Sequence, residues 1–356
     1  MKKSKVYFIP VEDRNNTKQL KSRLDKIIAQ SGLLDNIKEK EFVAVKLHFG
    51  EKGNDGYVKP EFIKLFVDKI KAKKAKPFLT DTNVLYKGMR SNAVDHLNMA
   101  REHGFTIDTI GAPIIIADGI FGENSRTYEI KGSHFSSIKA VSVLPFLDHV
   151  VCVTHCTGHM VTSYAGALKN IFMGFASRAG KQIQHSSIKP SILAEKCILC
   201  RRCMAVCPEK AICEKDERSF ILQQKCIGCA ECIIACKQFA IKINWTEDQR
   251  FVEEKMVEYA HGILTNIKNK VFFNFALYIT KNCDCMEKSP VLADNIGILA
   301  SCDPLAVDKA CFDLILKKSG LDVFKKSYHE SSCERIFEYA EKIGIGTADY
   351  LLEEIK

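Results

Sequence analysis

The chain lacks the short motifs and long apolar runs that would assign it to the commonest cofactor, nucleotide or membrane classes. No Gly-x-Gly-x-x-Gly follows a predicted strand and no Gly-x4-Gly-Lys occurs, so neither a nicotinamide nor a nucleoside triphosphate is expected, whereas a flavin bound without a motif stays open. No stretch approaches the run of about eighteen apolar residues that a membrane helix needs, and the best candidate, residues 271–279, has the length of a strand. No basic and aromatic motif gathers the lysines, so nucleic-acid binding is not expected either.

Cysteine, in contrast, is abundant, with sixteen residues, and one spacing pattern occurs twice. The two runs are Cys197-x2-Cys200-x2-Cys203-x3-Cys207-Pro208 and Cys226-x2-Cys229-x2-Cys232-x3-Cys236. Three thiolates at this spacing hold one corner of an iron–sulfur cube, and the fourth is directed to the neighbouring cube. We therefore predict two [4Fe–4S] clusters. The first is expected to bind Cys197, Cys200, Cys203 and Cys236, and the second to bind Cys226, Cys229, Cys232 and Cys207.

Zinc and disulfides are the alternatives for such closely spaced cysteines. Zinc needs four ligands at each site and has no reason to prefer three evenly spaced thiolates with a distant fourth, used twice. Disulfides are not expected in a reducing compartment. The segment resembles the bacterial two-cluster ferredoxin module, which consists of two halves of about thirty residues each. It departs from that module in having Lys237, and not proline, after the second run.

The charge and the start of the chain bear on partners and location. The formal net charge is +9, and two oxidised clusters with their thiolates would contribute about −2 each, leaving about +5. Lysine is spread along the chain, which indicates ordinary solvated surface first and a docking face for an acidic redox partner protein second. Residues 1–5 resemble the basic start of a signal peptide, but the apolar run at 6–10 is too short for one. We therefore expect a cytoplasmic protein, in a cell that keeps oxygen away from its clusters.

Before the cysteine runs, strand-type apolar segments alternate with helical patterns. Strands are predicted at residues 6–10, 42–47, 76–80, 114–117 and 148–154. Helices are predicted at residues 17–30, 60–71, 92–103 and 164–173. This alternation predicts an α/β fold with a mostly parallel sheet and helices on both faces.

After the cysteine runs the α/β pattern resumes. A helix is predicted at residues 248–267, strands at 270–280 and 296–300, and a last helix through residue 318 that opens with Asp303 as N-cap and Pro304 at its first position. The cysteine-rich module therefore looks inserted into one α/β domain. The predicted division is residues 1–187 for the first part, 188–245 for a small α+β two-cluster ferredoxin module, and 246–356 for the second part.

Polar residues gather where the predicted strands end, which is where open α/β sheets bind their ligands. Five such endings suggest one shared pocket. They are residues 46–50, 80–83, 154–159, 282–285 and 301–304, with Lys169-Asn170 on a helix nearby.

Each candidate at these endings also has a structural explanation. His48 could be a histidine held against the edge of the sheet, and Asp81 could cap a turn. His155 and His159 are four residues apart and would face the same way on a helix, but Thr157-Gly158 favours a loop, so joint metal binding stays an alternative. Lys169 is a surface lysine or, if buried, an anion-binding group or a lysine with a lowered pKa.

Cys283 and Cys285 are the most suggestive pair outside the two runs. On an extended backbone their sulfurs would point to the same side, which suits a soft metal or a nucleophilic thiolate. Two unrelated buried cysteines are the alternative, and a local disulfide is not expected. A third metal site at this pair is therefore a hypothesis.

Five separated motifs resemble the DUF362 family, and the resemblance covers nearly the whole chain. They are Val-Lys-Leu-His-Phe-Gly-Glu at 45–51, Thr-His-Cys-Thr-Gly-His at 154–159, Gly-Ala-Leu-Lys-Asn at 166–170, Cys-Asp-Cys at 283–285, and Ile-Gly-Ile-Leu-Ala-Ser-Cys-Asp-Pro at 296–304. In many members a two-cluster ferredoxin module likewise lies between the two parts. The resemblance implies that six residues belong together, namely His48, His159, Lys169, Asn170, Cys283 and Cys285. It implies no reaction, and where the family has a second glycine this chain has Ala165.

These features predict an iron–sulfur electron-transfer protein. The first hypothesis is an oxidoreductase in which electrons pass through the two clusters to the pocket at the strand ends, where His48, His159, Lys169, Cys283 and Cys285 are the candidate catalytic residues. The second is an electron carrier or assembly subunit without its own substrate. The third is a non-redox enzyme with structural clusters, in which Lys169 and His159 perform acid–base chemistry.

Overall fold

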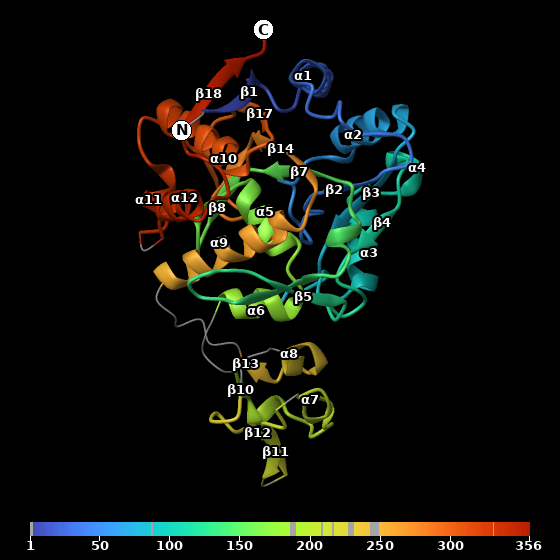
Figure 1. The fold of residues 1–356 in the computed structure, drawn as a ribbon, viewed down its shortest axis with the longest axis vertical. Helices are drawn as coiled ribbons and strands as arrows, with labels where there is room; N and C mark the ends of the chain where they lie inside the picture. The colour runs from blue at the N-terminus through green and yellow to red at the C-terminus, as the bar shows by residue number, and fades with distance from the viewer. Residues whose placement is uncertain are drawn as a thin grey trace.

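The computed structural model describes residues 3–86, 88–185, 190–207, 209–215, 217–226, 231–242, 249–329 and 331–356. Figure 1 shows a large α/β body and, at one end of its long axis, a smaller unit that contains the cysteine runs. Among the described residues, no helix is both long enough and apolar enough to cross a membrane.

An eight-stranded sheet forms the centre of the large body (Figure 1). Its strands, in spatial order, are β18 (Tyr350–Glu354), β1 (Ser4–Pro10), β17 (Gly297–Ser301), β14 (Asn269–Ala276), β7 (His149–His155), β2 (Phe42–Lys46), β3 (Lys76–Asp81) and β4 (Ile114–Ile116). Every neighbouring pair is parallel except the two pairs that β17 makes, so the predicted mostly parallel sheet is confirmed.

Helices cover both faces of this sheet, as predicted. On one face, α1 (Thr17–Ser31) and α2 (Pro60–Ala72) bury Leu24 and Phe66 in the same core as Val45 and Phe273 of the sheet. The other face packs against α5 (Ala167–Gly174), α9 (Gln249–Thr265), α10 (Pro304–Ser319) and α12 (Cys333–Lys342). The strands are therefore buried on both sides, which explains why they read as continuous apolar runs in the sequence.

The remaining elements of the large body are short. The helices are α3 (Ala93–Glu102), α4 (Ile107–Ile110), α6 (Arg178–His185), α11 (Val323–Ser327) and the 3-10 turn at Leu144–Phe146. The strands form three small antiparallel pairs: β5 (Ser125–Glu129) with β6 (Ser137–Val141), β8 (Thr157–His159) with β9 (Ser163–Ala165), and β15 (Ile279–Thr280) with β16 (Val291–Ala293).

Two predicted elements differ from the structure where this matters for the site. The helix predicted at 164–173 begins only at Ala167, because residues 163–165 form a strand of the β8–β9 hairpin. The strand predicted at 270–280 ends at Ala276, since Tyr278 takes a positive φ of 53° and the chain turns there. Asp303, in contrast, caps α10 as predicted, because its carboxylate accepts the N–H groups of Leu305 and Ala306. The start of the helix predicted at 248–267 lies outside the described residues, which resume at Gln249.

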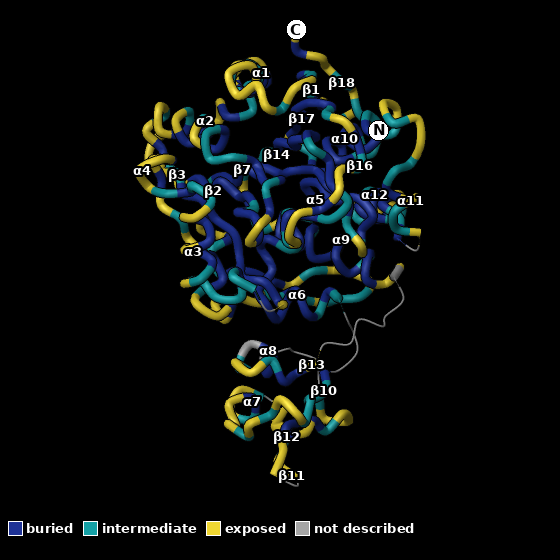
Figure 2. The backbone as a smooth tube through the Cα atoms, turned by 180° about the vertical axis from the view of Figure 1, so that it is seen from behind, coloured by how far each residue is buried: buried dark blue, intermediate teal, exposed yellow. Residues whose placement is uncertain are grey.

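In the described residues of the smaller unit there are two antiparallel strand pairs and two short helices. Strand β10 (Ser191–Ile192) pairs with β13 (Ile241–Lys242), and β11 (Ile212–Lys215) pairs with β12 (Arg218–Ile221). Its helices are α7 (Arg202–Ala205) and α8 (Glu231–Ala235), and the 3-10 turn Ala194–Lys196 precedes the first cysteine run. Figure 2 shows that many described residues of the smaller unit are exposed, in contrast to the buried residues at the centre of the large body.

Candidate functional site

One cavity of about 510 Å³ lies at the carboxyl ends of the parallel strands β2, β3 and β7. Four of the five predicted strand endings contribute residues to its lining, and Lys169 and Asn170 reach it from α5. The six residues that the family motifs suggested belong together all line it, namely His48, His159, Lys169, Asn170, Cys283 and Cys285. The expectation of a shared pocket therefore holds for these residues.

The fifth ending, residues 301–304, lies elsewhere, and its inclusion in the pocket was wrong. Strand β17 runs antiparallel to both of its neighbours, so its carboxyl end lies at the opposite edge of the sheet. There Asp303 accepts hydrogen bonds from the Ser4 hydroxyl and the Thr347 N–H, close to both ends of the chain. Cys302 is exposed at this edge and is remote from the strand ends that form the pocket.

Two of the histidines that line the pocket, His48 and His159, are held in one tautomer by backbone N–H groups. Nδ1 of His48 accepts the N–H of Gly50 at 3.0 Å. Nδ1 of His159 accepts the N–H groups of Val161 at 3.3 Å and Thr162 at 3.2 Å. Because an accepting Nδ1 carries no proton, a neutral imidazole must carry its proton on Nε2.

Both imidazoles are neutral at ordinary pH. Burial, followed by the charge of Arg90, lowers the pKa of His48 well below its usual value. Burial, followed by the charge of Lys169, does the same to the pKa of His159. Each ring therefore presents a neutral Nε2–H donor, and neither is a general base at Nδ1.

Three ion pairs occupy most of the charged groups around the pocket. Lys46 lies 3.0 Å from Asp81, Arg90 lies 3.2 Å from Glu51, and His155 lies 2.9 Å from Asp284. Lys46 and Asp81 are the last residues of the neighbouring parallel strands β2 and β3, and the register places Lys46 opposite Thr80, next to Asp81. Asp81 therefore does more than cap a turn.

The pKa values in this group follow from burial and pairing. Burial alone would raise the pKa of Asp81, but the neighbouring cations, Lys46 foremost, hold it below the usual value. Burial raises the pKa of Asp118 to about 7, although the charge of Lys181 opposes that rise. Burial lowers the pKa of Lys181 to about 8, and its ammonium donates to Thr82 and Asn83.

Lys169 differs from the other pocket cations. Among the described residues it makes no hydrogen bond and no ion pair, although its side chain reaches the cavity from α5. Partial burial, followed by the charge of Arg90, lowers its pKa to about 8. Lys169 is therefore neither an exposed surface lysine nor a fully buried one, because its side chain is half-buried and lines the cavity.

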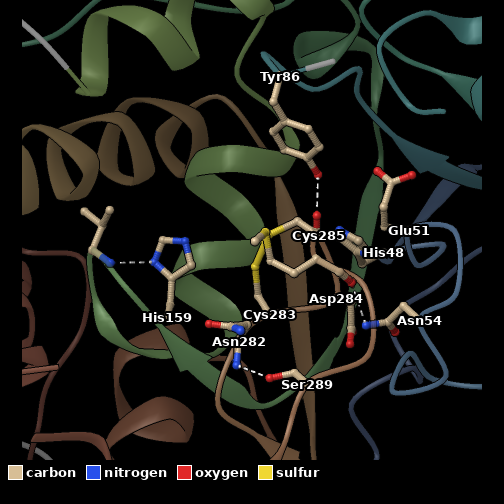
Figure 3. The surroundings of a disulfide bond; sticks show 12 residues. His48, Glu51, Asn54, Tyr86, His159, Asn282, Cys283, Asp284, Cys285 and Ser289 are labelled. Carbon is tan, nitrogen blue, oxygen red and sulfur yellow. Dashed lines mark hydrogen bonds between the residues drawn. A yellow bond between two sulfur atoms is a disulfide. The ribbon is translucent and has the colours of Figure 1, made fainter. Parts of the chain in front are cut away.

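The structure joins Cys283 and Cys285 in a disulfide, which the sequence analysis had not expected (Figure 3). The expected extended backbone was wrong: residues 283–286 form a turn in which the N–H of Met286 donates to the Cys283 carbonyl at 3.0 Å. The turn brings the two Cα atoms to 5.3 Å, within the range that a disulfide spans. In this state the sulfurs are neither thiolate nucleophiles nor metal ligands, and both roles require prior reduction.

His155 positions this turn and does not share a metal with His159. Its Nδ1 lies 2.9 Å from Asp284, and its Nε2 donates to the carbonyl groups of Leu277 and Tyr278. Burial opposes its charge, but Asp284 and these carbonyl groups raise the pKa of His155 above its usual value. With both ring nitrogens engaged, His155 has no lone pair for a metal.

In the smaller unit, the four cysteines predicted for the first cluster line one cavity. Cys197, Cys200, Cys203 and Cys236 all contribute to its wall. The fourth cysteine of each run also occupies an equivalent position, because Cys207 accepts the N–H of Ala211 at 3.2 Å and Cys236 accepts that of Ala240 at 3.3 Å. The residues present at this cavity therefore fit one cube.

The second set is described only in part. Cys207, Cys226 and Cys232 lie in the described part of the chain, whereas Cys229 and Pro208 lie outside the described residues. Within the described ranges, no three His, Cys, Asp or Glu side chains lie close enough to hold one metal ion. A cube with iron at alternate corners spreads its thiolates farther apart than a single ion does, so the shared cavity is the better test of fit.

Four further pocket residues carry polar or charged side chains that no sequence pattern singled out: Tyr86, Arg90, Lys181 and His185. Arg90 is 1% exposed, and it donates to Tyr86, whose hydroxyl in turn donates to the Cys285 carbonyl at 2.8 Å. Tyr86 and Arg90 lie in a loop without periodicity, and Lys181 lies on a helix of eight residues, so no sequence pattern marked them.

Comparison with known protein families finds one match. The model of the family described as "Domain of unknown function (DUF362)" matches residues 43–313. No curated protein matches the chain.

Two solved structures show weak likeness. One is a Thermotoga maritima protein from a structural genomics consortium, with 10% identity and a TM-score of 0.42 over 93% of this chain and 60% of that one. The other is the lactate racemase apoprotein from Thermoanaerobacterium thermosaccharolyticum, with 9% identity and a TM-score of 0.38 over 77% of this chain and 51% of that one. The chain thus spans less than two thirds of either protein. A likeness this weak does not support any conclusion about function.

Proposed function

The chain belongs to the DUF362 family, and on that premise we propose that it is an iron–sulfur oxidoreductase in which electrons pass through two [4Fe–4S] clusters to the pocket at the strand ends. The clusters would be held by a ferredoxin-type module at residues 188–245, inserted into one α/β domain of residues 1–187 and 246–356. A separate redox protein would supply or accept the electrons, and the location would be cytoplasmic.

The cluster assignment is supported by the cysteines that share a cavity. Four thiols from both runs, including the distant Cys236, meet at one wall, as exchanged fourth ligands require. When bound, such clusters take up and release single electrons. The described thiols of the second set, with Cys229, would hold the other cluster.

Helix α6 gives the main support for the proposal, because it contacts α8 of the smaller unit and also contributes residues to the pocket. Figure 1 shows α6 at the end of the large body that faces the smaller unit. Its Ala179 is buried in the same apolar cluster as Cys203 and Cys232. Two turns or less along the same helix, Lys181 and His185 line the pocket. A second contact places the ammonium of Lys237 4.7 Å from the ring of Phe121. The site and the module are thus separated by one short helix, which favours electron passage between them.

The pocket also holds a group that can accept electrons. Two electrons and two protons convert the Cys283–Cys285 disulfide into two thiols. These thiols would then be available as ligands for the tentative third metal. A pocket that contains His48, Cys283 and Cys285 together supports the oxidoreductase over an electron carrier, which would need no such cavity.

Metal and sulfide analysis with EPR spectroscopy during stepwise anaerobic reduction tests this function. The wild-type protein should contain about eight irons and give two interacting paramagnetic centres. Cys200→Ser should lose about half of the iron and sulfide. Cys213→Ser is the matched control, because Cys213 lies in the same unit, in β11, but outside both runs.

A full iron content in Cys200→Ser, an equal loss in Cys213→Ser, or zinc in place of iron would contradict the cluster assignment. Turnover that persists after the clusters are oxidatively destroyed would instead favour a non-redox enzyme with structural clusters.

A further inference from the structure

Three hydrogen-bond donors face the pocket without an acceptor from the described protein. They are Nε2–H of His48, Nε2–H of His159 and the ammonium of Lys169. They belong together, since the charge of Lys169 is close enough to lower the pKa of both imidazoles. In the view of Figure 3 the disulfide lies between the two histidines. Donors that line a cavity and find no acceptor in the protein bind water or a ligand, so a ligand that binds here should supply acceptor atoms.

Of the cationic side chains around the pocket, only Lys169 has no carboxylate partner among the described residues. Lys46, Arg90 and His155 each face a carboxylate within 3.2 Å, and Lys181 interacts with the Asp118 charge. Lys169 has no carboxylate at ion-pair distance among the described residues. A ligand with one negative charge would complete the balance.

The helix N-terminus nearest to this point is already occupied. The N–H groups of Ala167 and Leu168, which open α5, donate to the two carboxylate oxygens of Asp308 at 2.6 and 2.9 Å. The backbone donors that commonly bind phosphate at a helix start are therefore used by the protein itself. Three donor groups, one of them a cation, match the two oxygens of a carboxylate better than the four of a phosphate.

Most of the exposed wall of the cavity is apolar, although charged and hydroxyl groups also line it. Leu85, Met160, Met173 and Val252 contribute side chains to the cavity, and Met286 follows the disulfide turn. A volume of about 510 Å³ is larger than a carboxylate alone requires. The body of the ligand should therefore be apolar.

We propose that the pocket binds an organic acid with a single carboxylate and an apolar body, with the carboxylate oxygens accepting hydrogen bonds from His48, His159 and Lys169. The inference rests on the proposed function only in that it takes this pocket as the place where substrate binds. Carboxylate binding needs no electron transfer, so the two can fail separately.

Calorimetric titration of the full-length protein with its clusters oxidised tests the inference. The probes are phenylacetate, its neutral amide phenylacetamide, and inorganic phosphate. Phenylacetate should bind saturably at millimolar concentration and more tightly than the other two. Lys169→Met should weaken phenylacetate binding about tenfold to a hundredfold, as expected for the loss of a hydrogen bond to a charged group.

Two further variants distinguish the loss of the Lys169 charge from a general loss of folded structure. Lys169→Arg keeps the charge and should retain most of the affinity. Lys64→Met removes an exposed lysine of α2 and should bind phenylacetate as wild type does. Each variant should keep the wild-type cluster absorbance and thermal midpoint, and His159→Phe provides an independent test if Lys169→Met does not fold.

Phenylacetate that does not bind, an amide that binds equally well, tighter binding of phosphate, or unchanged affinity in both Lys169→Met and His159→Phe would overturn the inference. About eight irons without carboxylate binding would refute this inference alone. Carboxylate binding to a protein that holds no clusters would refute the proposed electron transfer alone.

Discussion

Removal of the Lys46 charge should destabilise the protein by about 3–5 kcal/mol, the usual cost of breaking a buried ion pair. The side chain of Lys46 is 1% exposed, and its ammonium lies 3.0 Å from Asp81. It also donates to the Leu47 carbonyl at 2.9 Å and to the Asn170 side chain at 2.6 Å. Methionine has a similar length and no charge, so Lys46→Met deletes these interactions without opening a large cavity.

The magnitude comes mainly from Asp81. Without Lys46, that carboxylate would keep Arg90 at 3.7 Å and His96 at 3.9 Å. His96 gives little help, because burial lowers its pKa to about 3 and leaves it neutral. The pKa of Asp81 should therefore rise, since burial is the largest influence on it and acts in that direction. Replacing both partners, as Lys46→Met with Asp81→Asn, should recover about 1–3 kcal/mol relative to the sum of the single changes.

Urea unfolding followed by circular dichroism measures these differences. Lys64→Met is the matched control, because its pair with Asp68 joins two half-exposed side chains and such a pair contributes about 0.3–0.5 kcal/mol. The dependence of this stability difference on pH has a definite direction. With a higher folded-state pKa for Asp81, the folded variant takes up its proton at higher pH, so its deficit relative to wild type should shrink as the pH falls.

A cost of Lys46→Met no larger than that of Lys64→Met would contradict a stabilising buried ion pair. A double change that costs the full sum of the two single changes, or a deficit of Lys46→Met that grows as the pH falls, would contradict the role given to Asp81.

Two further predictions concern the pocket. Because the pKa of Lys169 is about 8, phenylacetate affinity should fall as the pH rises from about 7 to about 9, and Lys169→Arg should abolish that fall; a flat wild-type profile would contradict it. The charged groups that face Lys169 are Arg90, Lys46, Asp81 and Asp284. Mass spectrometry after alkylation should find Cys283 and Cys285 unlabelled in oxidised protein and labelled after reduction with dithiothreitol, and labelling without reduction would refute the disulfide. Buried Cys152, whose pKa burial raises to about 12, should stay unlabelled in both states.

Much of the fold could be predicted from local patterns. The alternation of apolar runs and helical periodicity predicted strands and helices near their observed positions, because each element buries one face or both. The capping of α10 by Asp303 followed from residue type alone. The direction of β17 did not, since strand periodicity is the same in either direction. That direction decided that residues 301–304 lie outside the pocket.

Some properties of the candidate site likewise follow from the sequence, and others only from the tertiary structure. The sequence by itself determined the cysteine spacing and the residues that end the parallel strands, because both depend on short-range order along the chain. Only the tertiary structure decided that the chain turns after Tyr278 and joins Cys283 to Cys285, that backbone N–H groups hold the histidine tautomers, and that Lys169 has no carboxylate partner among the described residues. These properties depend on atoms far apart in the sequence. Ion pairing, tautomer and burial are therefore set by packing, which no local pattern encodes.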